Sequence, residues 1–444
     1  MEVRDKKITI LGAARSGVAA ARLLKAKGAK VFVSDIMEYA LKKDIAKELE
    51  SEGIPFEFGG HSGKVGESEF IVLSPGIPVK SEFVRSLIAK GIPVYSEIEI
   101  ASWFCQAPMI AVTGSNGKTT TTTLIGEMLK KCYPDAIVAG NIGFPFSAYV
   151  QESHKETWAV IEVSSFQLET IDRFHPKQAV VLNFAPNHLD RYDSYEDYLK
   201  AKWRIKKNLN SRDHLIYNAA DEKLSEWARN IAAVKLGFDI DGDEKEQAYY
   251  KNESIYVFGQ KLIDSKDMIL RGRHNYMNAM AAALAASNAG ISIDQIRETL
   301  TTFKGVEHRL EMVREINGVK FVNDSKATTV ESLSFALQSF NTPVILIAGG
   351  KDKGSDFTRL NDLIKKHVKE LVLIGQAAEK MTEIWHKLKP VHHPETLEQA
   401  VETAFKLAAP NDVVLLSPAC ASFDMFSDFE DRGRQFKAIV NGLK

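Results

Sequence analysis

One short stretch limits the fold of this chain more than any other, residues 109–129, which read MIAVTGSNGKTTTTTLIGEML. An apolar run leads into a glycine turn, then a lysine and a row of threonines, and then a helical pattern. This is the order of a strand, a phosphate-binding loop and a helix N-terminus, where backbone N–H groups and the helix dipole face an anion. The stretch therefore predicts an α/β domain that binds phosphate.

The predicted phosphate loop is a variant, because GSNGKT has two residues between its glycines where the Walker pattern has four. The expected phosphate ligands are Gly114, Ser115, Asn116, Gly117, Lys118, Thr119 and Thr120. Lys118 supplies a point charge for the β- and γ-phosphates, and the Thr119 hydroxyl is a candidate ligand for Mg²⁺. A glycine turn without function, placed before a Lys-Thr helix, is the alternative.

Apolar strand patterns alternate with helical patterns along most of the chain, in three series that open with KITILG, MIAVTG and VKFVNDSKA. Such alternation is typical of parallel sheets that carry helices on both faces. The predicted fold is α/β with three tandem domains. These are a Rossmann-like N-terminal domain over 1–98, a P-loop ATPase-type central domain over 99–304 and a Rossmann-like C-terminal domain over 305–444.

Composition excludes several classes of function. The net charge of −1 and the lack of a long basic block disfavour a nucleic-acid partner. No apolar run approaches the ~18 residues of a membrane span, and the start MEVRDKKITILG lacks the apolar core of a signal peptide. Three cysteines without metal-like spacing are expected to be small buried thiols in a reducing compartment. We therefore expect a cytoplasmic protein without a membrane partner.

The first glycine loop, ILGAARSGVAAARLL, is similar to a dinucleotide fingerprint but has Ala14 in place of the middle glycine. That glycine is where the backbone approaches a pyrophosphate most closely, so its absence disfavours an NAD-dependent oxidoreductase. The helix N-terminus can still hold a diphosphate, with Asp35 at the end of the next strand as a further candidate. A purely structural turn is the alternative.

Other polar residues follow predicted strands, where ligands bind in such sheets. Glu162 ends WAVIEV and is either a magnesium ligand or a capping acid for SSFQLE. His188 follows another strand in NHLDRY, although a lone histidine is more often structural. Asn141 in GNIG is a substrate contact or a turn residue. Lys202 lies in DYLKAKWRIKKN, whose basic residues alone predict a solvated face.

Nine motifs occur in an order that resembles the Mur ligases of peptidoglycan synthesis: TGSNGKTT, AGNIG, EVSSFQLE, NHLDRY, AKWRI, GRHNYMNAMAA, EHRLE, NDSKAT and LLSPACASFDMFSDFEDRG. SSFQLE and SPACASFDMF are similar to the members that add D-glutamate. The resemblance implies that ATP phosphorylates a carboxylate of UDP-N-acetylmuramoyl-L-alanine and that D-glutamate attacks the acyl phosphate. We also expect a monomer. Another Mur ligase or a folylpolyglutamate synthase-like ligase is the alternative, but the latter lacks a UDP-binding first domain.

The resemblance also assigns roles to residues. Catalysis falls to Lys118, Glu162, His188 and Lys202, and two Mg²⁺ ions are held by Thr119, Glu162, His188 and a Lys202 carbamylated by CO₂. Asn278, Arg309 and Asp324 bind ATP, and Asp35 and Asn141 bind the UDP substrate. The D-glutamate pocket is assigned to Lys326, Thr328, Lys353, Ser422 and Phe429, with Lys351 as a competitor of Lys353. A nucleotide switch without chemistry is disfavoured, because a switch needs no second metal site.

Overall fold

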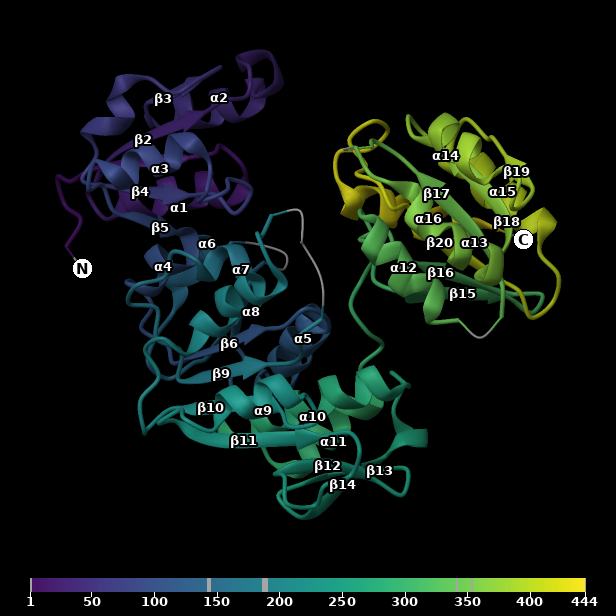
Figure 1. The fold of residues 1–444 in the computed structure, drawn as a ribbon. Helices are drawn as coiled ribbons and strands as arrows, with labels where there is room; N and C mark the ends of the chain where they lie inside the picture. The colour runs from purple at the N-terminus through teal and green to yellow at the C-terminus, as the bar shows by residue number, and fades with distance from the viewer. Residues whose placement is uncertain (1, 142–144, 186–190, 341, 353, 444) are drawn as a thin grey trace. The chain divides into compact units, whose positions relative to one another are not determined.

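The computed structural model describes residues 2–141, 145–185, 191–340, 342–352 and 354–443, and the chain divides into two compact units, Met1–Phe303 and Lys304–Lys444 (Figure 1). Within these described residues the strands form three sheets, of five and nine strands in the first unit and six in the second. The predicted α/β class is confirmed. The boundaries near residues 98 and 304 stay predictions.

The first sheet is fully parallel, with the order β3-β2-β1-β4-β5 of a doubly wound fold. Its strands are β1 (Lys7–Leu11), β2 (Lys30–Asp35), β3 (Phe56–Phe58), β4 (Phe70–Leu73) and β5 (Val94–Ser96). Its helices are α1 (Arg15–Ala26), α2 (Lys43–Ser51) and α3 (Glu82–Ala89). Ile10 packs with α1 and α2, whereas its neighbour Leu11 packs with α3. The alternation of apolar side chains along each strand thus covers both faces.

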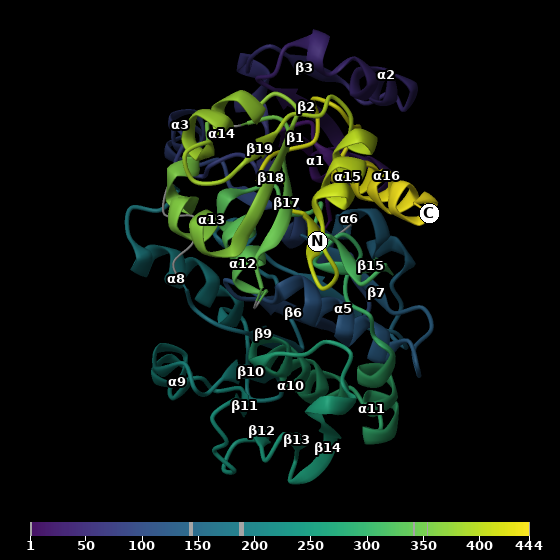
Figure 2. The same ribbon diagram turned by 90° about the vertical axis from the view of Figure 1, so that its right-hand side faces the viewer.

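The second sheet has the order β14-β13-β12-β11-β10-β9-β6-β8-β7. Its strands are β6 (Met109–Thr113), β7 (Ile137–Gly140), β8 (Ala159–Glu162), β9 (Gln178–Val181), β10 (His214–Asn218), β11 (Val234–Asp239), β12 (Ala248–Lys251), β13 (Ser254–Val257) and β14 (Gln260–Asp264). Its helices are α5 (Lys118–Leu129), α6 (Phe146–Tyr149), α7 (Ser165–Leu168), α8 (Tyr195–Trp203), α9 (Glu222–Ala228), α10 (Arg273–Asn288) and α11 (Ile293–Thr302). Helices α5, α10 and α11 share one apolar core on one face, and α6, α7 and α9 share another (Figures 1 and 2).

The end of this sheet departs from the predicted all-parallel arrangement. Strands β12, β13 and β14 pair antiparallel and extend the sheet beyond β11. The turn between β12 and β13 places Asn252 and Glu253 in the left-handed region, at φ 48° and 58°. Two successive left-handed residues match the right-handed twist of a tight hairpin, so this turn sets the antiparallel pairing.

The third sheet has the order β15-β16-β20-β17-β18-β19 and is parallel except for β15, which pairs antiparallel with β16. Its strands are β15 (Glu311–Ile316), β16 (Val319–Asn323), β17 (Val344–Gly349), β18 (Val368–Ile374), β19 (Val391–His392) and β20 (Val413–Leu416). Its helices are α12 (Val330–Gln338), α13 (Asn361–His367), α14 (Ala378–Trp385), α15 (Leu397–Leu407) and α16 (Phe429–Gly442). Helices α12, α13 and α14 cover one face, and α15 and α16 cover the other.

Helix α4 (Glu97–Ser102) connects the first two sheets through two buried glutamates. Both oxygens of Glu99 accept hydrogen bonds from backbone N–H groups: Oε2 from Asp172 and Phe174 at 2.9 and 2.8 Å, and Oε1 from Arg173 at 2.8 Å. Oε1 also accepts from the indole of Trp103 at 2.6 Å. A fully buried carboxylate therefore fixes the turn after α7.

The second glutamate, Glu97, is bound less completely. Its Oε1 accepts from the backbone N–H and the hydroxyl of Ser147, both at 2.6 Å. Its Oε2 has no hydrogen-bond partner among the described residues. Burial raises the pKa of Glu97, because the charged form is not solvated there.

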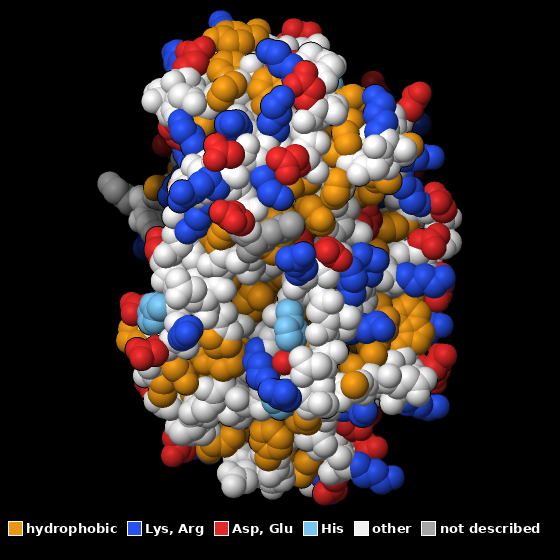
Figure 3. Space-filling model, turned by 90° about the vertical axis from the view of Figure 1, so that its left-hand side faces the viewer, with side chains coloured by type: hydrophobic (Ala, Val, Ile, Leu, Met, Phe, Trp, Pro, Cys, Tyr) orange, Lys and Arg blue, Asp and Glu red, His pale blue; other side chains and the backbone are white. Residues whose placement is uncertain are grey.

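Charged side chains of both signs are interspersed over the face seen in Figure 3. Over the described part of the chain, no helix combines the length and the apolar character that a bilayer crossing requires. The expectation of three buried thiols is wrong in part, because Cys420 is buried but Cys132 is exposed and Cys105 is half-buried.

We expect Glu99→Gln to lower the free energy of unfolding by about 3 kcal/mol. Each oxygen of Glu99 accepts from two N–H groups. In either orientation the NH₂ group of the glutamine would therefore face two N–H donors and leave them without an acceptor. Glu97→Gln is the matched control, because its amide can occupy the position of the unbonded Oε2 and keep both bonds to Ser147. Urea denaturation followed by tryptophan fluorescence measures both variants, and equal stability of the two would contradict the assigned role of Glu99.

Candidate active site

The phosphate loop lies between β6 and α5, as predicted, and its shape depends on a distant helix. Gly117 has a φ of 81°, a conformation that residues with a Cβ rarely adopt. A Cβ at this position would lie 2.3 Å from Oδ1 of Asn278, which is buried on α10. Asn278 also accepts a bond from the Thr121 hydroxyl at 3.3 Å. The loop and the first turn of α5 are therefore fitted against α10.

Two lysine side chains converge on one carbonyl of this loop. The amine of Lys118 donates to the carbonyl oxygens of Gly114 and Ser115 at 2.9 and 3.0 Å. The amine of Lys202 donates to the same Gly114 oxygen at 2.9 Å. Two amines that share one acceptor lie within a few ångströms of each other, so the charge of each acts on the other.

Lys202 is buried, with 2% of its surface exposed, so the solvated face that its basic neighbours predicted is wrong for this residue. Burial is the main cause that holds its pKa well below the usual range, and the nearby charge of Lys118 lowers it further. The charge of Glu162 acts in the opposite direction. An amine with a lowered pKa loses its proton at a lower pH than an ordinary lysine, and the neutral amine is the nucleophilic form.

Glu162 ends β8 and is almost completely buried. Its Oε1 accepts a hydrogen bond from the side chain of Asn141 at 2.9 Å, and the Asn141 backbone N–H donates to the Glu162 carbonyl at the same distance. Oε2 of Glu162 has no hydrogen-bond partner within the described ranges. A buried carboxylate oxygen without a donor suits a hard cation such as Mg²⁺. The residues present therefore fit a magnesium ion at this strand end.

Two residues that the sequence reasoning missed, one after β9 and one on α8, form hydrogen bonds with the phosphate loop. Asn183, just after β9, accepts from the Asn116 N–H at 2.9 Å through Oδ1 and donates to the Asn116 carbonyl at 3.1 Å. Its own carbonyl accepts from the Ser115 N–H at 3.1 Å. Tyr198 on α8 lies 3.0 Å from the Ser115 hydroxyl. The position of Asn183 after an apolar strand, QAVVL, was a signal that could have found it.

The remaining predicted residues of the second sheet lie near this loop. Thr119 is buried and Thr120 is half-buried at the start of α5. Asn275 lies one turn before Asn278 on α10, and its side chain donates to the Arg271 carbonyl at 3.0 Å. That bond gives Asn275 a role at the N-terminus of α10.

Asp35 lies at the end of β2, beside the first glycine loop. Its Oδ2 accepts from the Ala13 N–H at 2.7 Å and lies 3.4 Å from the Lys42 amine, and its Oδ1 accepts from the Met37 N–H at 2.9 Å. The carboxylate is thus engaged by its own domain. These contacts indicate that Asp35 shapes the first glycine loop, in addition to the substrate contact predicted for it.

In the second unit, Asp324 follows β16 and is buried. Its Oδ2 accepts from the Ser417 hydroxyl at 2.7 Å and its Oδ1 from the Leu310 N–H at 3.2 Å. Burial raises the pKa of Asp324 to about 7, with the nearby Arg309 acting in the opposite direction. Arg309 and Asp324, both predicted to bind ATP, therefore belong to one cluster of this unit.

The residues predicted to bind D-glutamate also gather in the second unit. The Lys326 amine lies 5.9 Å from the ring centre of Phe429, the first residue of α16. A buried arginine that the sequence reasoning missed, Arg432, donates to the carbonyls of Ser325 at 2.9 Å and Cys420 at 3.3 Å. Arg432 thereby joins the NDSKAT segment, which carries Lys326 and Thr328, to the SPACASF segment, which carries the buried Ser422.

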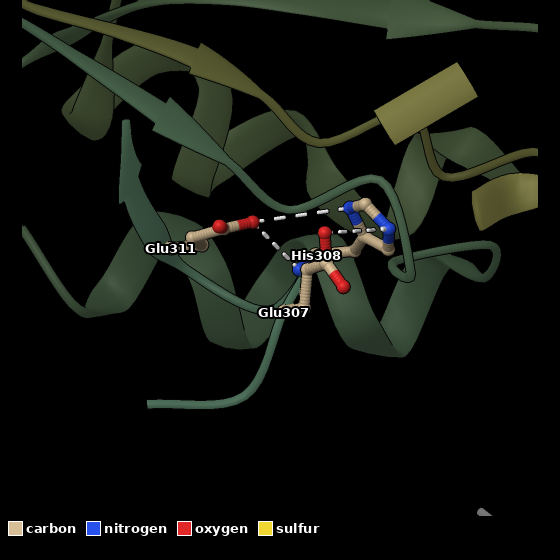
Figure 4. Close-up of side chains that lie close together, drawn as sticks. All are labelled: Glu307, His308 and Glu311. Atoms are coloured by element: carbon tan, nitrogen blue, oxygen red, sulfur yellow. Dashed lines mark hydrogen bonds and ion pairs between the residues drawn. The ribbon is translucent and has the colours of Figure 1, made fainter. Parts of the chain in front are cut away.

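One cluster of possible metal ligands, Glu307, His308 and Glu311, lies near the start of the same unit (Figure 4). The Lys437 amine lies 2.9 Å from Glu307 and 2.6 Å from Glu311. A lysine between the two carboxylates already balances their charge, so we assign this cluster a structural role.

Two predicted residues, His188 and Lys353, lie outside the described residues. Lys351, the competitor of Lys353, is exposed, and its backbone pairs with that of Ala421. Of the other predictions, Gly114, Ser115, Asn116, Gly117, Lys118, Thr119, Glu162, Lys202, Asn141 and Asn278 come together around the loop of the second sheet.

Comparisons with known proteins agree with this arrangement. Residues 6–96 match the Mur ligase MurD-like N-terminal domain, residues 112–286 the Mur ligase middle domain, and residues 308–420 the Mur ligase glutamate ligase domain. The UDP-N-acetylmuramoylalanine--D-glutamate ligases of Salinibacter ruber and Koribacter versatilis are each 43% identical to the chain, covering 100% of it and 99% of their own length. The crystal structure of UDP-N-acetylmuramate-alanine ligase MurC from Thermotoga maritima has a TM-score of 0.61 at 19% identity, over 99% of this chain and 100% of that one.

The chain therefore belongs to the Mur ligase family. Within the family, its first domain matches the MurD-like model, and the two full-length relatives named above are UDP-N-acetylmuramoylalanine--D-glutamate ligases.

We expect Asn183→Ala to weaken the binding of an ATP analogue by about tenfold or more, because two hydrogen bonds that hold Asn116 are lost. Asn218→Ala is the matched control, since Asn218 ends the neighbouring strand β10 and bonds to Ala220 instead of the loop. Titration calorimetry with Mg²⁺ and a non-hydrolysable ATP analogue measures both. An unchanged affinity in Asn183→Ala would remove Asn183 from the site.

Proposed function

We infer that this chain is an ATP-dependent ligase that joins D-glutamate to UDP-N-acetylmuramoyl-L-alanine through an amide bond, in the synthesis of peptidoglycan precursors. The observation that carries this inference is the 43% identity, over the whole chain, to ligases of that name. The match of residues 6–96 to a MurD-like N-terminal domain argues against a folylpolyglutamate synthase-like ligase. We further propose that the protein is cytoplasmic and acts as a monomer.

The chemistry proceeds in two steps. A carboxylate oxygen of UDP-N-acetylmuramoyl-L-alanine attacks the γ-phosphorus of ATP, and the bond between that phosphorus and the ADP oxygen breaks, which gives an acyl phosphate and ADP. The amine of D-glutamate then attacks the acyl carbon, phosphate leaves, and the amine loses a proton. Catalysis of such a transfer is mostly positioning and electrostatic stabilisation, because both reactants are anions.

We assign the first step to the phosphate loop. The loop of residues 114–117 and the charge of Lys118 hold the β- and γ-phosphates, although the N–H groups of Ser115 and Asn116 donate to Asn183. The two Lys118 bonds to loop carbonyls, at 2.9 and 3.0 Å, support this assignment, because they keep its amine beside the loop. Thr120 adds a hydroxyl and Asn278 a further nucleotide contact, and Arg309 and Asp324 are the ATP ligands proposed for the second unit.

Mg²⁺ fits the acidic end of this site, and two ions are proposed. The proposed ligands are Thr119, Glu162, His188 and Lys202 carbamylated by CO₂. When bound, Mg²⁺ shields phosphate charge so that a carboxylate can approach. The unbonded Oε2 of the buried Glu162 supports the first ion, and the buried Lys202 with its lowered pKa supports carbamate formation, since a neutral amine attacks CO₂.

Substrate binding is divided between the two units. Asp35 and Asn141 are proposed to contact the UDP-N-acetylmuramoyl substrate. D-Glutamate has two carboxylates and therefore needs a pocket of cations and hydrogen-bond donors. The residues proposed to form this pocket are Lys326, Thr328, Lys353, Ser422 and, through its backbone N–H, Phe429. The Phe429 N–H lies in the first turn of α16, where helix geometry leaves N–H groups free of intrahelical acceptors.

The assigned reaction predicts phosphate release that requires ATP, UDP-N-acetylmuramoyl-L-alanine and D-glutamate together. Lys118→Ala should lower turnover by about 10³-fold, because the positive charge that stabilises the transferred phosphate is lost. Lys130→Ala, at the far end of the same helix, is the control and should match the wild type. A phosphate-release assay across amino acids tests the substrate, and equal turnover with L-glutamate would overturn the assignment.

The carbamate on Lys202 has its own test. Lys202→Ala should be inactive and should regain part of its activity with added short carboxylic acids, which replace the carbamate oxygens. Lys200→Ala is the control, since Lys200 lies two residues earlier on α8 but is exposed. Carbon-13 NMR with labelled bicarbonate should show a carbamate signal in the wild type and lose it in Lys202→Ala. A wild-type enzyme that turns over without such a signal would contradict the modification.

A further inference from the structure

The first glycine loop, between β1 and α1, is fixed by residues that follow the strands on both sides of β1. The Ser74 hydroxyl, just after β4, donates to the Gly12 carbonyl at 2.8 Å. Asp35, at the end of β2, accepts from the Ala13 N–H at 2.7 Å. The strand order of the sheet reverses at β1, and ligands bind at such a point in α/β sheets. The loop is therefore a rigid feature at the place where a ligand is expected.

A lysine that the sequence reasoning did not single out lies against this loop. Lys42 stands between a one-turn helix, Tyr39–Leu41, and the start of α2. Its amine donates to the Ala13 carbonyl at 2.9 Å and lies 3.4 Å from Oδ2 of Asp35. Only 15% of its side-chain surface is exposed. The ammonium group is thus held beside the residue that precedes Ala14, the N-cap of α1.

The charges around the loop suit an anion only because Lys42 is present. The first turn of α1 has no acidic residue, and its N–H groups lack intrahelical acceptors, so it attracts negative charge. The Asp35 carboxylate, bonded to the same loop, would repel an anion there, and the Lys42 ammonium opposes that repulsion. An ammonium has three N–H donors, and Ala13 and Asp35 engage at most two of them. One donor therefore remains for a ligand.

The residue at the N-cap adds a reason for a side-chain cation. Ala14 stands where a dinucleotide fingerprint has its middle glycine, and it is exposed. Its Cβ hinders the closest approach of a pyrophosphate to the loop backbone. A lysine that reaches the loop from α2 supplies positive charge without requiring that approach.

We propose that Lys42 binds the diphosphate of the UDP substrate at the first glycine loop. This inference deepens the proposed function and rests on it. The other role open to Lys42 is to neutralise Asp35 without touching the substrate. The two roles differ in what happens to UDP binding when the charge of Asp35 is also removed.

Lys42→Met removes the charge and nearly keeps the length of the side chain. We expect it to weaken UDP binding about tenfold or more in titration calorimetry, because a charged hydrogen bond is lost. The KM for UDP-N-acetylmuramoyl-L-alanine should rise by a similar factor. The kcat and the KM for ATP should change less than about twofold, since the diphosphate is bound alike in the ground state and the transition state. Lys43→Met is the control, because Lys43 is the next residue but is exposed, and it should match the wild type.

A second background separates the two roles of Lys42. In Asp35→Asn, adding Lys42→Met should still weaken UDP binding about fivefold or more, because the contact with the diphosphate does not depend on Asp35. Lys42→Arg keeps the charge and should stay within about threefold of the wild-type affinity. Circular dichroism melting checks that each variant is folded, and Lys42→Gln is a second neutral variant if Lys42→Met is unstable.

Equal UDP affinity in the wild type and Lys42→Met would overturn the proposal. A loss that disappears in the Asp35→Asn background would overturn it as well, because Lys42 would then serve Asp35 alone. The calorimetric measurement needs neither ATP nor D-glutamate. A wild type that binds UDP but releases no phosphate with all three substrates would therefore refute the proposed function alone, and a fully active wild type matched in KM by Lys42→Met would refute only the role of Lys42.

Discussion

The site depends on a balance of charge around one buried lysine, Lys202. Lys118 and Lys202 donate to one carbonyl oxygen, that of Gly114, and Lys202 is buried. Burial, and after it the charge of Lys118, lowers the pKa of Lys202 strongly. The charge of Glu162, at the next strand end, acts in the opposite direction, and its Oε2 has no hydrogen-bond partner among the described residues. The arrangement is an incomplete set of charges, which phosphate oxygens and a divalent cation would complete.

A second buried carboxylate, that of Glu99, lies outside the site and is stabilised differently from that of Glu162. Glu99 is also fully buried, but donors saturate both of its oxygens, so it acts as a fixed structural anchor. In the part of the chain that the structure describes, Glu162 has a donor on one oxygen only. The number of hydrogen-bond donors around each acid, and not its burial, distinguishes the structural glutamate from the candidate metal ligand.

Much of this organisation is visible in the sequence, because glycine turns and apolar strands have strong local patterns. The phosphate loop, the strand that ends in Glu162 and the α/β class all follow from local residue order. The hairpin after β11 was missed, since its short strands and left-handed turn at Asn252 give little apolar signal. Lys202 was misjudged from its basic neighbours, because burial is decided by what the helix packs against.

Residues that act through long-range contacts could not be found from local patterns either. Tyr198 and Arg432 have no unusual sequence context, and each becomes informative only when its partners are known. Their partners lie on other strands and helices, which the fold brings together. Sequence reasoning thus located the groups that carry charge, and the structure was needed to find the groups that hold them in place.

The contact between Gly117 and Asn278 has a consequence for how the protein is made. Asn278 belongs to α10, which follows every strand of the second sheet along the chain. During synthesis the loop therefore emerges long before the side chain that shapes it. A nascent chain that ends before α10 contains the loop residues but not Asn278, against which the loop packs. Nucleotide binding therefore requires that the whole domain of the second sheet has been synthesised.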